Sequence, residues 1–228
     1  MDSNLAMLAQ RALDYVPDGG RIGLGSGRTA EAFLHVLAER VRQGLRVRGV
    51  PTSEGVARLA TSLGIPLDTL DALEPLAVTV DGADEVERGS LFLIKGWGSA
   101  LVRERIVAAA SRVQVIVVTA EKLVDRLGSR GKLPVEVVPF AARFCQRRIE
   151  QLGLRGGLRP AGGAAGQPLV TDNGNWIVDC AVSPLDDAPA LERTLRAIPG
   201  VVDTGLFLGT AAVVLVAEGG TVTELRAR

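Results

Sequence analysis

Four side chains between positions 81 and 104 are of the types that move protons on a small substrate. Asp81 and Asp84 lie in the carboxylate-rich segment 81–85, Lys95 follows an apolar pair, and Glu104 falls in the next expected helix. A carboxylate can take a proton and return it, and an ammonium group stabilises the negative charge left behind. If these segments converge on one crevice, the residues predict acid–base catalysis.

Each of these residues also fits a structural role when it is taken alone. Asp81 and Asp84 could cap backbone N–H groups in a turn. Glu104 could be solvated, since the apolar face of its helix is expected to carry Leu101, Ile106 and Val107. The catalytic interpretation is favoured if these residues converge in one place. Residues 75–80 are typical of a short buried strand. Segment 81–85 then lies at a carboxyl end, where open α/β sheets bind ligands.

A glycine-rich segment near the N-terminus predicts an anion site. Residues 23–29 (GLGSGRT) follow an expected strand and open an expected helix, so backbone N–H groups and the helix dipole can converge on a phosphate. The hydroxyls of Ser26 and Thr29 and the guanidinium of Arg28 add donors for a phosphate monoester. A tight turn without a ligand is the alternative.

Two nucleotide-binding motifs are excluded in this segment. A dinucleotide fingerprint needs glycine where Arg28 stands and an acid after the next strand, where residues 50–52 are Val-Pro-Thr. A phosphate-binding Walker loop needs Gly-Lys-Ser or Gly-Lys-Thr, and neither ends the segment.

Composition limits the remaining classes. Lys plus Arg and Asp plus Glu are both 26, so no charge excess favours nucleic acid or a membrane surface as partner. His35 is the only histidine, which argues against histidine-based catalysis or metal binding, and Cys145 and Cys180 form no CxxC pair. Residues 1–10 lack a signal-peptide pattern, and the longest apolar run, 211–217, is too short to span a bilayer. We expect a cytoplasmic protein.

Hydrophobic periodicity predicts an α/β fold with a mostly parallel sheet flanked by helices. Strands are expected at residues 21–24, 46–50, 76–80, 91–94 and 113–119, alternating with helices at 4–16, 29–43, 54–63 and 99–110. From residue 133 the expected order is a strand at 135–138, a helix at 140–152, strands at 169–171 and 176–181 paired across the turn 172–175, a helix at 190–197 and a strand at 201–206. Residues 212–217 can return to the first sheet. This pattern predicts a main domain of residues 1–132 and 208–228, with a smaller α+β domain, 133–207, inserted near the C-terminus.

The motifs together resemble those of the ribose-5-phosphate isomerase type A family. They are residues 81–85 (DGADE), 93–96 (LIKG), 103–104 (RE), 133–137 (LPVEV), 171–175 (TDNGN) and 198–201 (IPGV), in collinear order. The resemblance implies a Rossmann-like main domain and a homo-oligomer, usually a dimer. It also implies a cofactor-free and metal-free aldose–ketose isomerase of the pentose phosphate pathway, which interconverts D-ribose 5-phosphate and D-ribulose 5-phosphate through an enediolate.

The resemblance also implies roles for single residues. Glu104 matches the proton acceptor, while Asp81, Asp84 and Lys95 match residues that hold sugar hydroxyls and assist ring opening. The substrate contacts implied are Ser26, Gly27, Arg28, Thr29, Asp81, Gly82, Ala83, Asp84, Lys95, Gly96, Trp97, Gly98 and Lys122.

Several positions depart from the family pattern. Arg28 stands where the phosphate loop usually has serine, Glu121 stands before Lys122 where serine is usual, and a lysine frequent near position 6 is replaced by Ala6. We expect the guanidinium of Arg28 to replace the missing ammonium group. Trp97 replaces glycine and adds bulk near the expected sugar, which leaves open an isomerase of another sugar phosphate. A non-catalytic sugar-phosphate sensor is the second alternative. Such a sensor would need no base, so the presence of Asp81, Asp84, Lys95 and Glu104 together argues against it.

Overall fold

A six-stranded sheet is the centre of the computed structural model, which describes residues 2–71, 75–162 and 166–227. Its strands are β1 (Gly20–Leu24), β2 (Val47–Pro51), β3 (Val78–Asp81), β6 (Gln114–Thr119), β13 (Val213–Glu218) and β14 (Thr221–Arg226). In the described part of the chain their order is β14-β13-β6-β3-β1-β2, and all neighbours are parallel except β13 and β14. The predicted parallel α/β sheet is confirmed, as is the return of the chain to it near residue 212.

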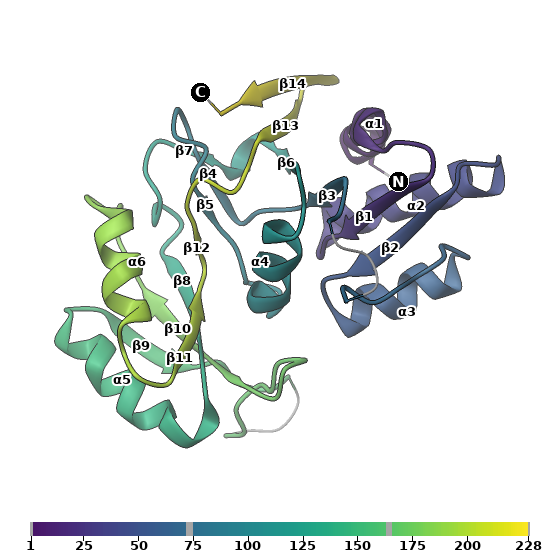
Figure 1. Cartoon of the computed structure of the whole chain (residues 1–228). Coiled ribbons are helices and arrows are strands. Elements are labelled where there is room, and N and C mark those ends of the chain that lie inside the picture. The colour runs from purple at the N-terminus through teal and green to yellow at the C-terminus, as the bar shows by residue number, and fades with distance from the viewer. Residues whose placement is uncertain (1, 72–74, 163–165, 228) are drawn as a thin grey trace.

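Helices cover both faces of this sheet (Figure 1). They are α1 (Ser3–Ala12), α2 (Arg28–Arg42), α3 (Glu54–Ser62) and α4 (Leu101–Ala109). Side chains alternate along β6, so Val115 and Val117 pack in one cluster with α1, α2 and α3. Ile116 and Val118 face the other way, into a cluster with Leu101 of α4. A strand buried on both faces explains why residues 115–118 form an unbroken apolar run.

A second sheet is antiparallel. It contains β8 (Lys132–Val137), β9 (Arg155–Leu158), β10 (Trp176–Ala181) and β11 (Val201–Thr204), in the order β11-β8-β10-β9. Helices α5 (Ala142–Gln151) and α6 (Ala188–Arg196) share an apolar cluster with it. Helix α4 contacts β3 of the first sheet and β11 of the second, so it lies between the two sheets.

The predicted hairpin between residues 169–171 and 176–181 is wrong. Residues 169–171 form no strand, and β10 pairs with β8 and β9 instead. The side chain of Thr171 is engaged elsewhere, because its hydroxyl donates to Glu136 Oε1 at 3.0 Å. The strand β9, with sequence Arg-Gly-Gly-Leu, was missed because its glycines carry no strand pattern.

A third, small sheet joins β4 (Glu85–Glu87), β5 (Leu93–Ile94), β7 (Leu123–Val124) and β12 (Leu206–Phe207). The strand expected at 91–94 is therefore shorter and does not enter the parallel sheet. Leu91 has φ 56°, a left-handed conformation that no strand residue adopts. Short 3₁₀ helices η1 (Leu13–Tyr15), η2 (Ala120–Lys122) and η3 (Pro139–Ala141) complete the elements.

The domain division, with residues 133–207 as an inserted domain, stays a prediction. Among the described residues, no helix is both long and apolar enough to cross a membrane.

Candidate active site

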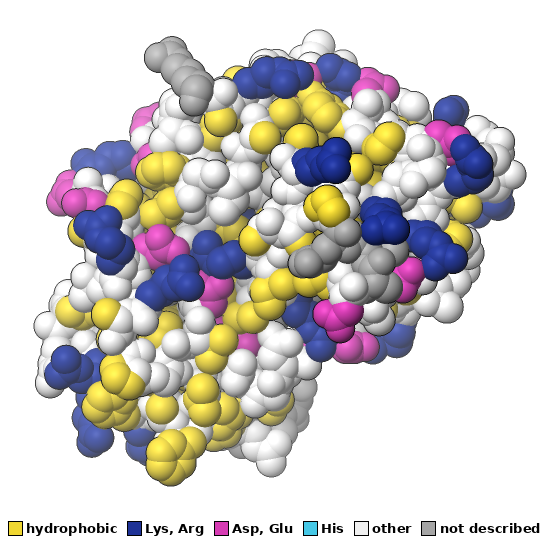
Figure 2. All heavy atoms as spheres, in the orientation of Figure 1, with side chains coloured by type: hydrophobic (Ala, Val, Ile, Leu, Met, Phe, Trp, Pro, Cys, Tyr) yellow, Lys and Arg dark blue, Asp and Glu magenta, His cyan; other side chains and the backbone are white. Residues whose placement is uncertain are grey.

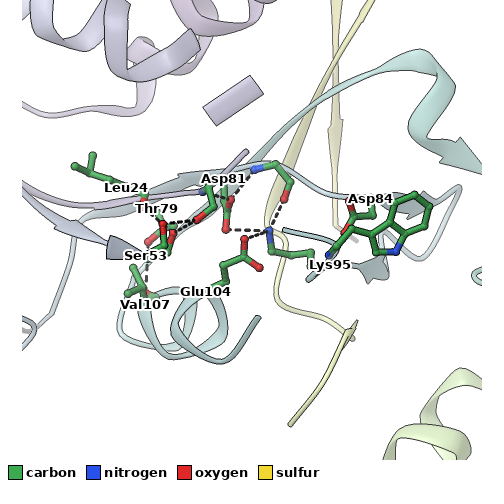
Figure 3. A network of polar contacts seen from close by, with 12 residues as sticks. Leu24, Ser53, Thr79, Asp81, Asp84, Lys95, Glu104 and Val107 are labelled. Atoms are coloured by element: carbon green, nitrogen blue, oxygen red, sulfur yellow. Dashed lines mark hydrogen bonds and ion pairs between the residues drawn. The ribbon is translucent and has the colours of Figure 1, made fainter. Parts of the chain in front are cut away.

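Three ionisable side chains meet beneath a cavity at the carboxyl ends of the parallel strands. Asp81 ends β3, Lys95 follows β5, and Glu104 lies in the first turn of α4. Lys95 Nζ lies 2.9 Å from Asp81 Oδ2 and 3.4 Å from Glu104 Oε1, and it donates to the carbonyl of Gly82 at 2.5 Å. Figure 3 shows the ammonium group between the two carboxylates. The predicted convergence of the two acids and the lysine is thus present in the structure.

Burial controls the charges of this cluster, since all three side chains are almost fully inaccessible to solvent. Burial raises the pKa of Glu104 to about 8, against the opposing charge of Lys95 and with the help of the negative charge of Asp81. Burial alone would lower the pKa of Lys95, but the carboxylates of Asp81 and Glu104 outweigh it, so this pKa is raised. Lys95 therefore stays charged while Glu104 can exchange a proton near neutral pH.

Asp81 also fixes the loop that follows β1. Its Oδ1 accepts hydrogen bonds from the backbone N–H of Ser26 at 3.0 Å and of Gly82 at 2.7 Å. A Cβ on Gly25 would lie 2.3 Å from the same oxygen, so only glycine lets the loop pass this close to the carboxylate. One side chain thus connects the glycine loop to the lysine.

Asp84 approaches the cavity from the other side of Lys95. Its Oδ2 accepts from the backbone N–H of Trp97 at 2.9 Å, which orients the carboxylate. Burial raises the pKa of Asp84, although this hydrogen bond and the charge of Lys95 oppose the shift. The group is therefore suited to exchanging a proton with a hydroxyl.

A cavity of about 200 Å³ lies above the cluster. It is lined by Ser26, Gly27, Arg28, Thr29, Gly82, Ala83, Asp84, Lys95, Gly96, Gly98, Glu104, Val118, Thr119 and Lys122. Asp81 lies behind Lys95 and does not line it. Val118 and Thr119 were missed from sequence, but the rule that ligands bind at strand ends could have found them, since β6 neighbours β3.

The glycine loop forms one end of the cavity. Gly27 precedes α2 with φ +87° and leaves the helix without a side-chain cap, so the first N–H groups of α2 are available to an anion. The hydroxyl of Ser26 lies 2.7 Å from that of Thr52, which donates in turn to the carbonyl of Leu24 at 3.0 Å. This end is suited to a phosphate group.

Arg28 lies at the rim of this end rather than inside it. Its side chain is 73% exposed, and Nη2 lies 4.0 Å from Glu121 Oε1. Glu121 also accepts a hydrogen bond from the hydroxyl of Thr119 at 2.5 Å. The two departures from the family pattern at these positions therefore face each other across the mouth of the cavity, whereas Ala6 lies on α1 and does not line it.

The indole of Trp97 points away from the cavity. Its Nε1 donates to the carbonyl of Lys132 at 3.2 Å, and Lys132, Arg130 and Lys122 place their cationic groups within 6 Å of the ring centroid. The ring packs with the second sheet's apolar cluster. Trp97 is not among the residues that line the cavity.

The apolar face expected for α4 is wrong at Ile106. Ile106 is 48% exposed, while Glu104 is buried in the same row as Leu101 and Val107. Residues three apart share one helix face, so burial of Leu101 and Val107 carries Glu104 inward. His35 is exposed on α2, and the described residues contain no cluster of ligand-type side chains that could hold a metal.

This fold and site define an acid–base enzyme for small phosphorylated substrates: a buried carboxylate paired with a lysine lies beside an uncapped helix N-terminus. Residues 48–220 match the family ribose 5-phosphate isomerase A (phosphoriboisomerase A). The chain belongs to this family.

Relatives match along almost the whole chain. The ribose-5-phosphate isomerase A of Gloeobacter violaceus is 50% identical over 217 residues, which cover 95% of this chain and 93% of that protein. The structure of ribose 5-phosphate isomerase A from Methanocaldococcus jannaschii superposes with a TM-score of 0.93 at 41% identity, covering 99% and 98% of the two chains. A D-ribose-5-phosphate isomerase solved in complex with phospho-erythronic acid has a TM-score of 0.93 at 35% identity, covering 98% of this chain and 97% of that one.

Proposed function

We propose that this chain interconverts D-ribose 5-phosphate and D-ribulose 5-phosphate in the cavity above Lys95, with Glu104 as the group that moves the proton. The observation that carries the proposal is the buried carboxylate of Glu104, 3.4 Å from the ammonium of Lys95 and lining the same cavity as the N-terminus of α2. Membership of the ribose 5-phosphate isomerase A family supports the substrate.

The reaction transfers one proton between neighbouring carbons. Glu104 takes the proton from C2 of the open-chain aldose, which leaves an enediolate, and returns it to C1 to give the ketose. A proton moves between the two oxygens at the same time, and Asp84 is placed to exchange it. A base held on a helix is well suited to serve both carbons, because its position is fixed while the substrate changes.

Fixed positive charge stabilises the enediolate. Lys95 lies at the floor of the cavity, and its charge is retained because Asp81 accompanies it. Preorganised donors act strongly in a site with little water.

The phosphate group belongs at the opposite end. The N–H groups of α2, the hydroxyls of Ser26 and Thr29, and the ammonium of Lys122 surround it. The relative solved in complex with phospho-erythronic acid supports a phosphorylated ligand, since that molecule also carries a phosphate group.

A coupled assay with D-ribose 5-phosphate, beside other five- and six-carbon aldose phosphates, tests the proposal. We expect D-ribose 5-phosphate to give the highest kcat/KM. Preference for another aldose phosphate, or binding without turnover, would contradict it. The orientation of Trp97 away from the cavity removes the reason for a shifted substrate, and the buried base argues against a sensor.

Activity should rise with pH because the base must be ionised to accept a proton. Burial raises the pKa of Glu104 to about 8, so below this pH a growing fraction of the enzyme carries a protonated, inactive carboxyl. We expect kcat/KM to fall roughly tenfold per pH unit below that pKa and to level off above it. Measurement between about pH 6 and 9, with inhibitor affinity at each pH as the control for phosphate ionisation, checks this. A flat profile would contradict it.

Arg28→Ser should raise KM about tenfold with little change in kcat. The phosphate is remote from the reacting carbons, so the change should affect binding more than turnover. An exposed guanidinium contributes a binding free energy at the lower end of the range for a charged hydrogen bond. Glu121→Ser is the matched variant, and it should lower KM because it removes a negative charge from the mouth of the cavity. An unchanged KM in Arg28→Ser would show that this side chain does not meet the phosphate.

The protein is further proposed to be a cytoplasmic homodimer. Cys145 and Cys180 are both buried free thiols, which suits a reducing compartment. Apolar side chains gather on the surface near α5 (Figure 2). Phe144 on α5 is 42% exposed, and Val138 and Phe140, which precede this helix, are 40% and 101% exposed. Such a patch suits a subunit contact. Sedimentation equilibrium of the wild type and of Phe140→Ser checks the assembly.

A further inference from the structure

A buried arginine just after a strand of the second sheet donates hydrogen bonds to the loop between Lys95 and α4. Arg159 follows β9, and its side chain is 9% exposed. Its Nη1 donates to the carbonyls of Gly96 at 3.2 Å and Trp97 at 2.9 Å, and to the hydroxyl of Ser99 at 2.8 Å. The same loop carries Trp97, which stands where the family usually has glycine.

The guanidinium is itself held in one plane. Asp179 on β10 accepts from Nε at 2.9 Å and from Nη2 at 2.6 Å, a bidentate pair that fixes the orientation of the remaining nitrogen. Nη1 is therefore aimed at the loop by the second sheet. A lysine could not reproduce this fork.

The loop needs such a hold because its backbone is strained. Ser99 has φ +73°, a left-handed conformation that is unfavourable for a residue with a Cβ. Its N–H donates to the carbonyl of Gly96 at 3.0 Å, which closes the turn, and its hydroxyl is bound by Arg159. Strained positions persist where surrounding contacts determine them. Here one side chain, Arg159, adds its contacts to the backbone hydrogen bond that closes the turn.

The hydrogen bonds from Arg159 fix the orientation of the peptide groups in this loop. In a trans peptide the C=O and N–H groups point in opposite directions. With the carbonyls of Gly96 and Trp97 turned to Arg159, the following N–H groups face the other side. The N–H of Trp97 does so, since it donates to Asp84 at 2.9 Å. The N–H of Gly98 has no acceptor among the described residues, and Gly98 lines the cavity.

We propose that Arg159 is a positioning residue for the isomerase reaction: through the carbonyls of Gly96 and Trp97 it aims the N–H of Gly98 at the enediolate oxygen. It also sets the start of α4, where the carbonyl of Ala100 accepts from the N–H of Glu104 at 2.9 Å. The inference rests on the proposed function for its catalytic part. Arg159 touches no substrate, and it acts through the loop.

Kinetics of Arg159→Met test the inference. We expect kcat to fall on the order of a hundredfold, the size of effect that a misplacement of about 1 Å produces, while KM changes less than about threefold. Arg155→Met, which changes an exposed arginine on the preceding strand β9, is the matched control and should behave as wild type. A wild-type kcat in Arg159→Met, or a change in KM alone, would overturn the proposal.

A second substitution separates positioning from general damage. Glycine adopts positive φ without strain, so Arg159→Met/Ser99→Gly should recover about tenfold of the lost kcat relative to Arg159→Met. Absence of recovery in a folded double variant would contradict the role assigned to loop strain. If Arg159→Met does not fold, Asp179→Asn, which keeps one acceptor for the guanidinium, should show the same kcat-selective loss, and wild-type kcat there would overturn the proposal.

Amide hydrogen exchange gives a readout independent of the reaction. We expect faster exchange at residues 97–101 in Arg159→Met, with exchange in β6 unchanged. If the wild type does not isomerise D-ribose 5-phosphate, the proposed function is refuted, but the expected change in exchange at residues 97–101 is unaffected. Unchanged exchange in the loop would show that the hydrogen bonds from Arg159 do not hold the loop in its conformation.

Discussion

Glu104→Gln is expected to lower kcat by about two to four decades while KM stays within about threefold of wild type. The amide keeps the shape of the carboxyl and can still accept a hydrogen bond from Lys95 Nζ. In the wild-type protein this nitrogen lies 3.4 Å from Glu104 Oε1. It cannot accept the proton from C2. The cavity, the helix N-terminus and the lysine all remain, so substrate should bind as before.

The measurement is steady-state kinetics with D-ribose 5-phosphate, together with calorimetric titration of the variant with the same sugar. Glu218→Gln, an exposed residue at the end of β13, serves as the control for losing one carboxylate. Turnover at the wild-type rate in purified Glu104→Gln would remove Glu104 from the mechanism.

Lys95→Met is expected to have the second large effect, on stability as well as on activity. The change leaves Asp81 and Glu104 buried without a cation, and removal of one partner from a buried ion pair costs about 3–5 kcal/mol. The pKa of Glu104 should rise further, since the opposing charge of Lys95 is gone. The variant should therefore show no measurable isomerisation near neutral pH.

Urea unfolding of a double variant checks the cause. In Lys95→Met/Asp81→Asn the amide oxygen can still accept from Ser26 and Gly82 as Asp81 Oδ1 does, while the uncompensated charge disappears. We expect it to recover roughly half or more of the lost free energy of unfolding, without recovering activity. If the double variant is less stable than Lys95→Met, charge burial is not the reason for the loss.

Much of the site could be predicted because its residues follow strand ends. The acids after β3 and the glycine loop after β1 occupy positions that a parallel sheet brings together. Glu104 is different, since the helical pattern taken alone made it a solvated residue. It became a candidate only together with the neighbouring acids and Lys95, and the resemblance to a known family gave it the role of proton acceptor. A buried charge breaks the rule that polar residues face water, and functional sites are where that rule fails.

Arg159 and the strand before it could not be predicted from local pattern. Residues 155–158 are Arg-Gly-Gly-Leu, which carries neither alternation nor β-branched side chains, and their pairing with β10 is decided by tertiary contacts. The target of Arg159, the carbonyl of Gly96, lies 63 residues earlier in the chain, in the loop between β5 and α4. Spacing within a sequence does not encode such a contact.

The position of β13 inside the six-stranded sheet links folding to the order of synthesis. β13 lies between β6 and β14, and Val213 to Ala217 pair with β6. A nascent chain emerges from its N-terminus, so β6 has a partner on one side only until these late residues have left the ribosome. Throughout the synthesis of the second sheet the apolar strand keeps an open edge, which is a template for pairing with other chains. This topology makes protection by a chaperone most valuable during that interval, before β13 completes the six-stranded sheet.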